Sequence, residues 1–390
     1  MPKVNPDIMR WARKTAGFSL EEAARKLGLS GDTATARLAA LEAGKKDPTR
    51  PMLVKMSEKY RRPLLTFYLP KRPQASDRGQ DLRTLPEAPP PGAEALLDAL
   101  LRDIFARQGL VKAALEETEE DEPLAFVGSG RIAEGVDAVV DSMRATFGVN
   151  LADFRRQRTA ENAFKLLRAG AEKAGVFVLL MGNLGSYHTD INARVFRGFA
   201  LADPIAPFVV INENDSRAAW SFTLLHELAH LWLGQTGVSG YEGEAEVEKF
   251  CDAAAARFLL DPWELIQLGT PGATGLGAFK ERIDEFANAR NVSRKMVAYN
   301  LLRSSIITAA TYRRLDDLFD AERAAYQIRE REGGGVVDYY VVRRHRVGPA
   351  LVDIVRRMIA GGTLSMTKAG RVLGVKPTSV ARVVENGQRA

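Results

Sequence analysis

Hydrophobic positions recur at helical spacing through most of this chain, and β-rich runs are confined to its middle. Apolar residues three and four positions apart predict the following helices: 6–15, 20–27, 33–43, 51–60, 93–116, 130–147, 152–174, 221–233, 248–261, 351–359, 365–373 and 378–385. Short runs rich in Val, Phe and Ile predict strands at 176–181, 195–200 and 208–211. The pattern therefore predicts an α+β fold that is mostly helical and contains one small sheet.

One predicted helix carries the motif His-Glu-x-x-His. Residues 221–233 contain neither Gly nor Pro, and two of the four histidines of the chain, His226 and His230, lie four positions apart in this segment. Residues at this spacing share one face of a helix and can bind the same metal ion. Glu227 lies beside them and can act as a base toward a water molecule on that metal. The alternative is a pair of helix histidines that only form hydrogen bonds.

A third metal ligand is expected from the helix at 248–261. Catalytic zinc usually has three protein ligands and one open position. Glu248 is the first choice because it begins the predicted helix, and Asp252, one turn later, can accept the second ring N–H of one histidine. Glu244 is the main rival among the neighbouring acidic residues. Zn2+ is the expected metal, and Mn2+ or Fe2+ remain alternatives.

The single cysteine, Cys251, is expected to pack in the core, and a lone cysteine fits a reducing compartment.

The middle of the chain resembles the ImmA/IrrE family of metallopeptidases. The resemblance rests on segments 196–200, 207–212, 222–230 and 248–262. In that family the third ligand is a Glu, followed three residues later by a small residue and then by Asn. The match here is Glu248, Cys251 and Asp252, so that an Asp replaces the usual Asn. The resemblance implies a zincin-like, gluzincin-type zinc peptidase that cleaves DNA-binding repressors in phage-type or stress-response circuits.

The N-terminal residues predict a helix-turn-helix bundle. Ser19 and Glu22 form a capping box at the start of the second helix, and a short turn leads to the third helix. The segments 19–28 and 41–49 resemble the Xre/Cro-type repressor family. The candidate DNA contacts are Thr33, Thr35 and Arg37 on the third helix and Lys45, Lys46 and Arg50 in the loop that follows it. The alternative is protein–protein contact, since the third helix has no Gln or Asn for reading adenine.

Basic residues are concentrated at the two ends of the chain. Residues 1–70 contain 14 Lys and Arg and 7 Asp and Glu, and residues 341–390 contain 10 Lys and Arg and 2 Asp and Glu. The net charge of the whole chain is only +6. This asymmetry indicates nucleic-acid contacts at both ends. The C-terminal pattern of helix, short turn and helix predicts either a second helix-turn-helix, with Lys376, Ser379 and Arg382 near DNA, or a substrate-recruiting or dimerising bundle. No internal repeat of fixed period is evident.

Four segments follow from these features. Residues 1–70 are expected to form the Xre-type DNA-binding domain, 71–150 a linker and helical segment, 151–310 the ImmA/IrrE-type peptidase domain, and 311–390 a basic helical domain. The linker includes Pro86 and the three prolines at 89–91. The chain has no apolar run of 18 residues and its N-terminus lacks a signal core, so a cytoplasmic protein without membrane contact is expected.

The expected function is that of a zinc-dependent endopeptidase that cleaves a transcriptional repressor and so derepresses stress-response or mobile-element genes. Tyr187, Tyr241 and His188 are alternative groups for stabilising the oxyanion. The strand that leads into the zinc helix is expected to pair with an extended substrate peptide; the alternative is an ordinary small sheet that covers the zinc helices. The alternatives are a non-cleaving DNA-binding regulator with a structural or sensory metal site, and an antitoxin-like partner-binding module. The expected partners are the protein substrate and DNA, with a homodimer left open.

Overall fold

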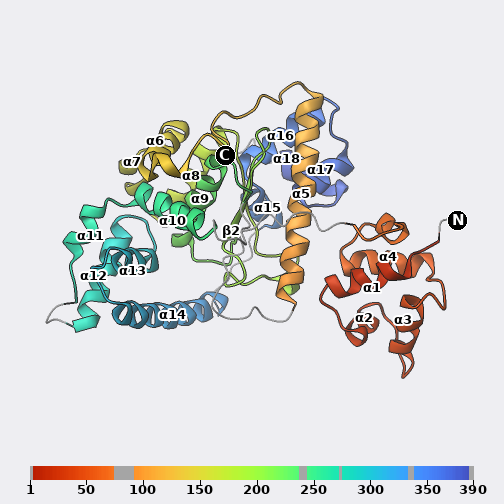
Figure 1. Ribbon diagram of the computed structural model, residues 1–390. Helices are drawn as coiled ribbons and strands as arrows, with labels where there is room; N and C mark the ends of the chain where they lie inside the picture. The colour runs from red at the N-terminus through yellow and green to blue at the C-terminus, as the bar shows by residue number, and fades with distance from the viewer. Residues whose placement is uncertain (1–2, 74–91, 237–243, 272–274, 333–337, 386–390) are drawn as a thin grey trace. The chain divides into compact units, whose positions relative to one another are not determined.

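The computed structural model describes residues 3–73, 92–236, 244–271, 275–332 and 338–385 (Figure 1). Helices dominate and three short strands form one sheet, so the predicted mostly helical α+β class is confirmed. The chain divides into two compact units. The first comprises residues 1–78, 83–104 and 183–195, and the second comprises 79–82, 105–182 and 196–390.

The first unit is a helical bundle at the N-terminus. Its elements are α1 Pro6–Thr15, α2 Leu20–Lys26, α3 Ala34–Glu42, α4 Arg50–Tyr60, the short 3-10 helices η1 Leu64–Tyr68 and η3 Tyr187–Thr189, and the first half of α5 Ala93–Glu117. Ser19 forms the predicted capping box with Glu22 at the start of α2. Ile8, Leu38 and Phe67 are fully buried in its core. A buried ion pair between Arg13 and Glu42, with a distance of 2.7 Å, joins α1 to α3.

The second unit is built around a three-stranded sheet. Its strands are β1 Phe177–Leu180, β2 Gly198–Leu201 and β3 Phe208–Ile211, in the order β1-β3-β2, with β1 parallel and β2 antiparallel to β3. Every strand residue is buried, which explains why the strands read as continuous apolar runs without alternation. The strand that leads into the His-Glu-x-x-His helix is β3. The expectation that it pairs with a substrate peptide is wrong, because both of its edges are already bonded within the sheet.

Helices pack on this sheet and on one another to form one large core. They are η2 Ile132–Glu134, α6 Val136–Phe147, α7 Leu151–Arg155, α8 Ala160–Lys173, α9 Arg217–Trp232, α10 Glu244–Leu259, α11 Pro262–Leu268, α12 Gly275–Ala289, α13 Arg294–Arg303 and α14 Ala309–Glu332. The single helix predicted over 152–174 is wrong. The chain breaks into α7 and α8, because the Thr159 side chain accepts a hydrogen bond from the Asn162 amide and starts a new helix. Cys251 is fully buried in the core.

The chain ends in a small helical group within the second unit. It consists of α15 Tyr339–Val347, α16 Pro349–Ala360, α17 Met366–Leu373, η4 Pro377–Ser379 and α18 Val380–Glu385. The buried Arg168 of α8 donates to the His345 carbonyl at 2.6 Å and to the Glu172 carboxylate at 2.9 Å. Arg346 pairs with Glu213 at 2.6 Å. These contacts attach α15 to the sheet domain. Among the described helices, none is both long and apolar enough to cross a membrane.

Candidate metal centre

Helix α9 brings the two histidines and the glutamate of the motif into the core. Its residues 223–232 are all buried, so the helix is enclosed by protein on every side. His226 and His230 are 0% exposed and Glu227 is 1% exposed. Polar groups at this depth need partners, and the histidine pair finds one on the neighbouring helix α10.

Three ligand atoms converge between α9 and α10, which lie side by side (Figure 1). The Nε2 atoms of His226 and His230 are 3.2 Å apart. The Glu248 carboxylate oxygens lie 3.3 Å from Nε2 of His226 and 3.2 Å from Nε2 of His230. With metal–ligand bonds of about 2.0–2.1 Å, neighbouring atoms of a tetrahedral site are about 3.3 Å apart. The three residues therefore fit a tetrahedral ion that keeps a fourth position open.

Asp252 is hydrogen-bonded to one of the histidines. Its Oδ1 lies 3.0 Å from Nδ1 of His226, so the ring N–H at Nδ1 donates to this carboxylate. The lone pair of Nε2 then faces Glu248 and His230, as a metal ligand requires. The expectation that Glu248 begins its helix is wrong, because α10 starts at Glu244. Glu248 thus lies in the second turn of α10, one turn before Asp252.

Gly198 of β2 packs directly against Glu227 and was not among the candidates predicted from the sequence. A Cβ atom at this position would lie 2.6 Å from Cγ2 of Thr223 and 2.9 Å from Oε1 of Glu227. Such distances are shorter than van der Waals contact, so no side chain fits here without movement of α9 or the strand. A glycine inside a β-rich run is the sequence signal of such a close approach.

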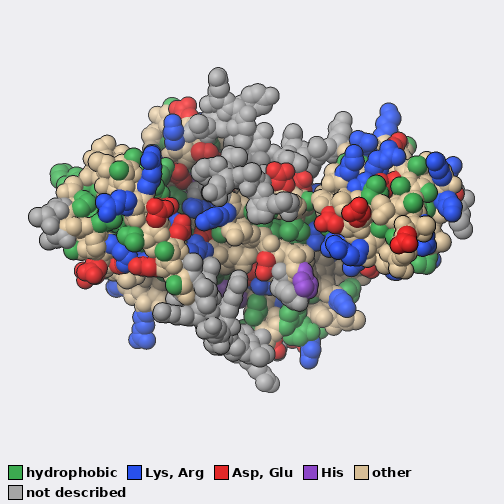
Figure 2. All heavy atoms as spheres, turned by 90° about the horizontal axis from the view of Figure 1, so that it is seen from below, with side chains coloured by type: hydrophobic (Ala, Val, Ile, Leu, Met, Phe, Trp, Pro, Cys, Tyr) green, Lys and Arg blue, Asp and Glu red, His purple; other side chains and the backbone are tan. Residues whose placement is uncertain are grey.

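The remaining candidates from the sequence belong to other parts of the chain. His188 is exposed on η3, Tyr187 lies on the same short helix, and Tyr241 is outside the described residues. The candidate DNA contacts of the first unit are at its surface. Thr35 is half-buried, and the exposed ones are Thr33, Arg37, Lys45, Lys46 and Arg50. Figure 2 shows Lys and Arg side chains gathered over the N-terminal helices on the face that it presents.

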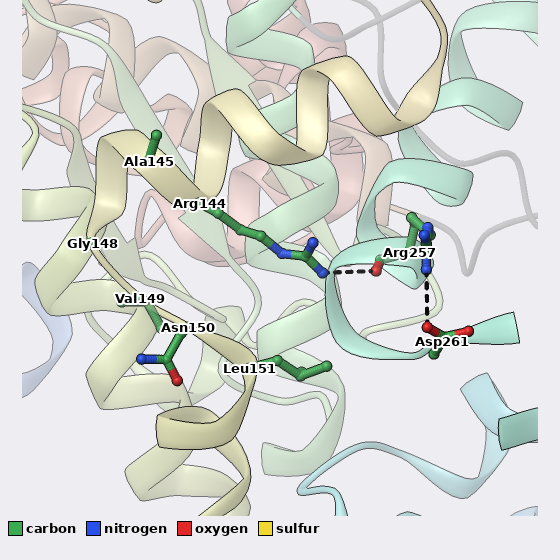
Figure 3. A pocket seen from close by; sticks show the side chains of 8 residues that line it. All are labelled: Arg144, Ala145, Gly148, Val149, Asn150, Leu151, Arg257 and Asp261. Atoms are coloured by element: carbon green, nitrogen blue, oxygen red, sulfur yellow. Dashed lines mark hydrogen bonds and ion pairs between the residues drawn. The ribbon is translucent and has the colours of Figure 1, made fainter. Parts of the chain in front are cut away.

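A separate surface cavity of about 600 Å³ lies between the α6–α7 connection and the end of α10 (Figure 3). Arg257 in its wall is nine residues after Glu248, which places it about 13 Å further along the helix. Arg144 donates to the carbonyls of Arg257 and Phe258, and Arg257 itself pairs with Asp137 and Asp261. Both guanidinium groups are thus engaged within the protein, and the cavity is not part of the metal centre.

The geometry defines the class of protein as one with a zincin-like His-Glu-x-x-His helix beside a small sheet, preceded by a helix-turn-helix unit. Comparisons with known families agree with both parts. Residues 171–302 match the family model of the IrrE N-terminal-like domain, which describes a family of peptidases, and residues 9–67 match that of a helix-turn-helix domain. The architecture expected from the resemblance is thereby confirmed. No curated protein and no solved structure matches the chain significantly.

Proposed function

We propose that this protein is a zinc-dependent endopeptidase. The observation that carries the proposal is the set of three ligand atoms on His226, His230 and Glu248, which are 3.2–3.3 Å apart. A bound Zn2+ ion would supply Lewis-acid chemistry, polarising the scissile carbonyl and lowering the pKa of water. The three candidate ligands are two imidazoles and one carboxylate, a combination that suits zinc. They include no cysteine, and Cys251 is buried in the core.

Glu227 is the proposed general base. Its carboxylate follows directly after the ligand His226 on the same helix and is held in place by the close packing of Gly198. It takes the proton from the attacking water and passes it to the nitrogen of the leaving amine. A structural metal site has no use for a buried carboxylate in this position, which favours catalysis over a purely structural role.

The proposed substrate is a DNA-binding repressor. The support is the combination of domains in one chain: a helix-turn-helix unit with exposed basic residues and an IrrE-like peptidase domain. A peptidase that binds DNA itself has its highest local concentration near other DNA-bound proteins. Cleavage of a repressor would then derepress stress-response or mobile-element genes.

The test compares cells that express the wild-type protein with cells that express Glu227→Gln, under DNA-damaging stress, with mass spectrometry of new protein N-termini. Glu246→Gln, an exposed residue of α10, is the matched control. We expect new termini in one DNA-binding protein with the wild type and the control, and none with Glu227→Gln. Metal content must be equal in all three proteins.

Identical N-terminal maps in all three strains would contradict the proposed peptidase. The same variants would then be compared for transcription of the regulated genes. Equal metal content with unchanged regulation by Glu227→Gln would identify a DNA-binding regulator that does not cleave.

A further inference from the structure

Helix α17 and the turn after it reproduce the first half of the N-terminal helix-turn-helix. Residues 19–29 read SLEEAARKLGL and residues 365–375 read SMTKAGRVLGV. Five of the eleven positions are identical, and they are those on which the motif depends: the Ser cap, an Ala, an Arg, a Leu and the Gly of the turn. The first copy lies within the segment that matches the helix-turn-helix family model, whereas the second lies far outside it.

The two copies share their N-terminal cap and the glycine that follows the helix, and they differ at the sixth position, where Gly370 takes the place of Ala24. The Ser19 side chain accepts from the Glu22 amide at 3.1 Å, and the Ser365 side chain accepts from the Lys368 amide at 3.3 Å. A glycine with positive φ follows each helix: Gly28, with φ +77°, comes two residues after the end of α2, and Gly374, with φ +63°, comes directly after α17. The next residue bonds back to the helix in both copies, at 2.9 Å in the first and 2.8 Å in the second.

The second copy continues into another short helical element after a tight turn. Only Gly374, Val375 and Lys376 separate α17 from η4, which runs into α18. A Cβ on Gly370 would lie 2.8 Å from the Val375 carbonyl oxygen, so glycine is needed where the turn crosses the helix. Val380 and Val383 are fully buried and fix α18 against the preceding helices. A three-residue turn between packed helices is the geometry of a DNA-binding helix-turn-helix.

Basic side chains are exposed along this element and are not neutralised. Lys368, Arg371 and Lys376 are exposed and form no ion pair with any described residue. Arg382 donates to the Tyr340 hydroxyl at 3.3 Å and lies over its ring. By contrast, the arginines of the neighbouring α16 are paired with acidic residues: Arg356 with Asp353, and Arg357 with Glu120. The positive charges that no described acidic residue neutralises are thus on the turn and on helices α17 and α18.

We propose that residues 365–385 are a second helix-turn-helix that binds duplex DNA, with η4 and α18 facing the major groove. Lys376 and Arg382 would be its principal contacts and would meet backbone phosphates beside the groove, and Lys368 and Arg371 would add further phosphate contacts. Arg344 donates to the Arg382 carbonyl at 3.2 Å, and Arg168 and Arg346 anchor the same helix α15 to the sheet domain. DNA bound here would therefore be held by the same compact unit that contains the metal centre.

The test measures the affinity of the full-length protein for a fluorescently labelled duplex of mixed sequence by anisotropy, over a series of salt concentrations. Every protein carries K45Q, K46Q and R50Q, so that binding by the N-terminal unit is weakened equally. The test variant adds K376Q and R382Q, and the control adds R356Q and R357Q. Both pairs remove two positive charges from the same helical group, so bulk charge is matched.

We expect K376Q/R382Q to raise Kd about tenfold or more and to reduce the slope of log affinity against log salt by about 2, since each phosphate contact contributes about 0.9. The control should change Kd less than about twofold. Equal effects of the two pairs, or no effect of K376Q/R382Q, would overturn the proposal.

Mapping of peptides photo-crosslinked to DNA in the unmutated protein gives an independent check. Cross-links within 375–385 are expected, and cross-links only within 1–70 would also overturn the proposal. Neither readout depends on peptidase activity.

Discussion

Replacing Gly198 with Ala tests whether β2 positions the proposed catalytic base. The added methyl group would lie 2.6 Å from Cγ2 of Thr223 and 2.9 Å from Oε1 of Glu227. Carbon atoms in contact prefer about 3.5–4.0 Å, so Thr223 and Glu227 must together retreat by roughly 1 Å. Both residues are on the buried helix α9, which cannot move into empty space.

Two magnitudes follow from this displacement. Overpacking of a well-packed core costs about 1–3 kcal/mol in the free energy of unfolding. A catalytic group that is misplaced by about 1 Å can lose about 100-fold in rate. The metal ligands are not among the three nearest contacts of the added methyl, so metal content should be preserved.

The assay combines the urea midpoint, the metal content per chain and the rate at which the new N-terminus appears in the substrate found by N-terminal mapping. Gly277→Ala in α12 is the control, because an added Cβ there meets no heavy atom within 4 Å. We expect Gly198→Ala to lose stability and about two orders of magnitude in rate while its metal is retained. If Gly198→Ala cleaved its substrate as fast as Gly277→Ala, Gly198 would have no positioning role.

Three further predictions follow from the contacts of buried polar groups. Asp252→Ala should weaken metal binding about 10–100-fold in chelator competition because His226 loses its orienting acceptor, whereas Asp252→Asn, which keeps an oxygen there, should recover most of the affinity. Burial, together with the nearby Arg168, lowers the pKa of His345 below its usual 6.5, so the folded state resists protonation. Stability should therefore be full above about pH 6.5 and fall as the pH drops below it, and His345→Gln should flatten this dependence of the urea midpoint. Glu42→Gln should destabilise the N-terminal unit by about 3–5 kcal/mol, because Arg13 is left buried beside a neutral group. Hydrogen exchange should show the loss in residues 6–42, and Arg13→Met with Glu42→Leu should restore most of the protection.

Local features of the fold were predicted well from the sequence. Helix α1 and strand β3 have the predicted bounds, and Ser19 caps α2 as expected, because caps and apolar periodicity depend on residues within a few positions. The break between α7 and α8 was missed, although Thr159 is a good cap, since the apolar pattern runs through the break. The start of α10 at Glu244 was also missed, because acidic residues form helices as readily as loops.

The sequence by itself determined the pair of histidines and the neighbouring Glu227, because a spacing of four on a helix fixes their common face. It also determined the basic character of both ends of the chain. Only the tertiary structure decided that Glu248 approaches the histidines, since this depends on how α10 packs against α9 across a long connection. The same holds for the central position of β3 and for Gly198 beside Glu227. These features arise from contacts between segments distant in the chain, which periodicity and spacing do not encode.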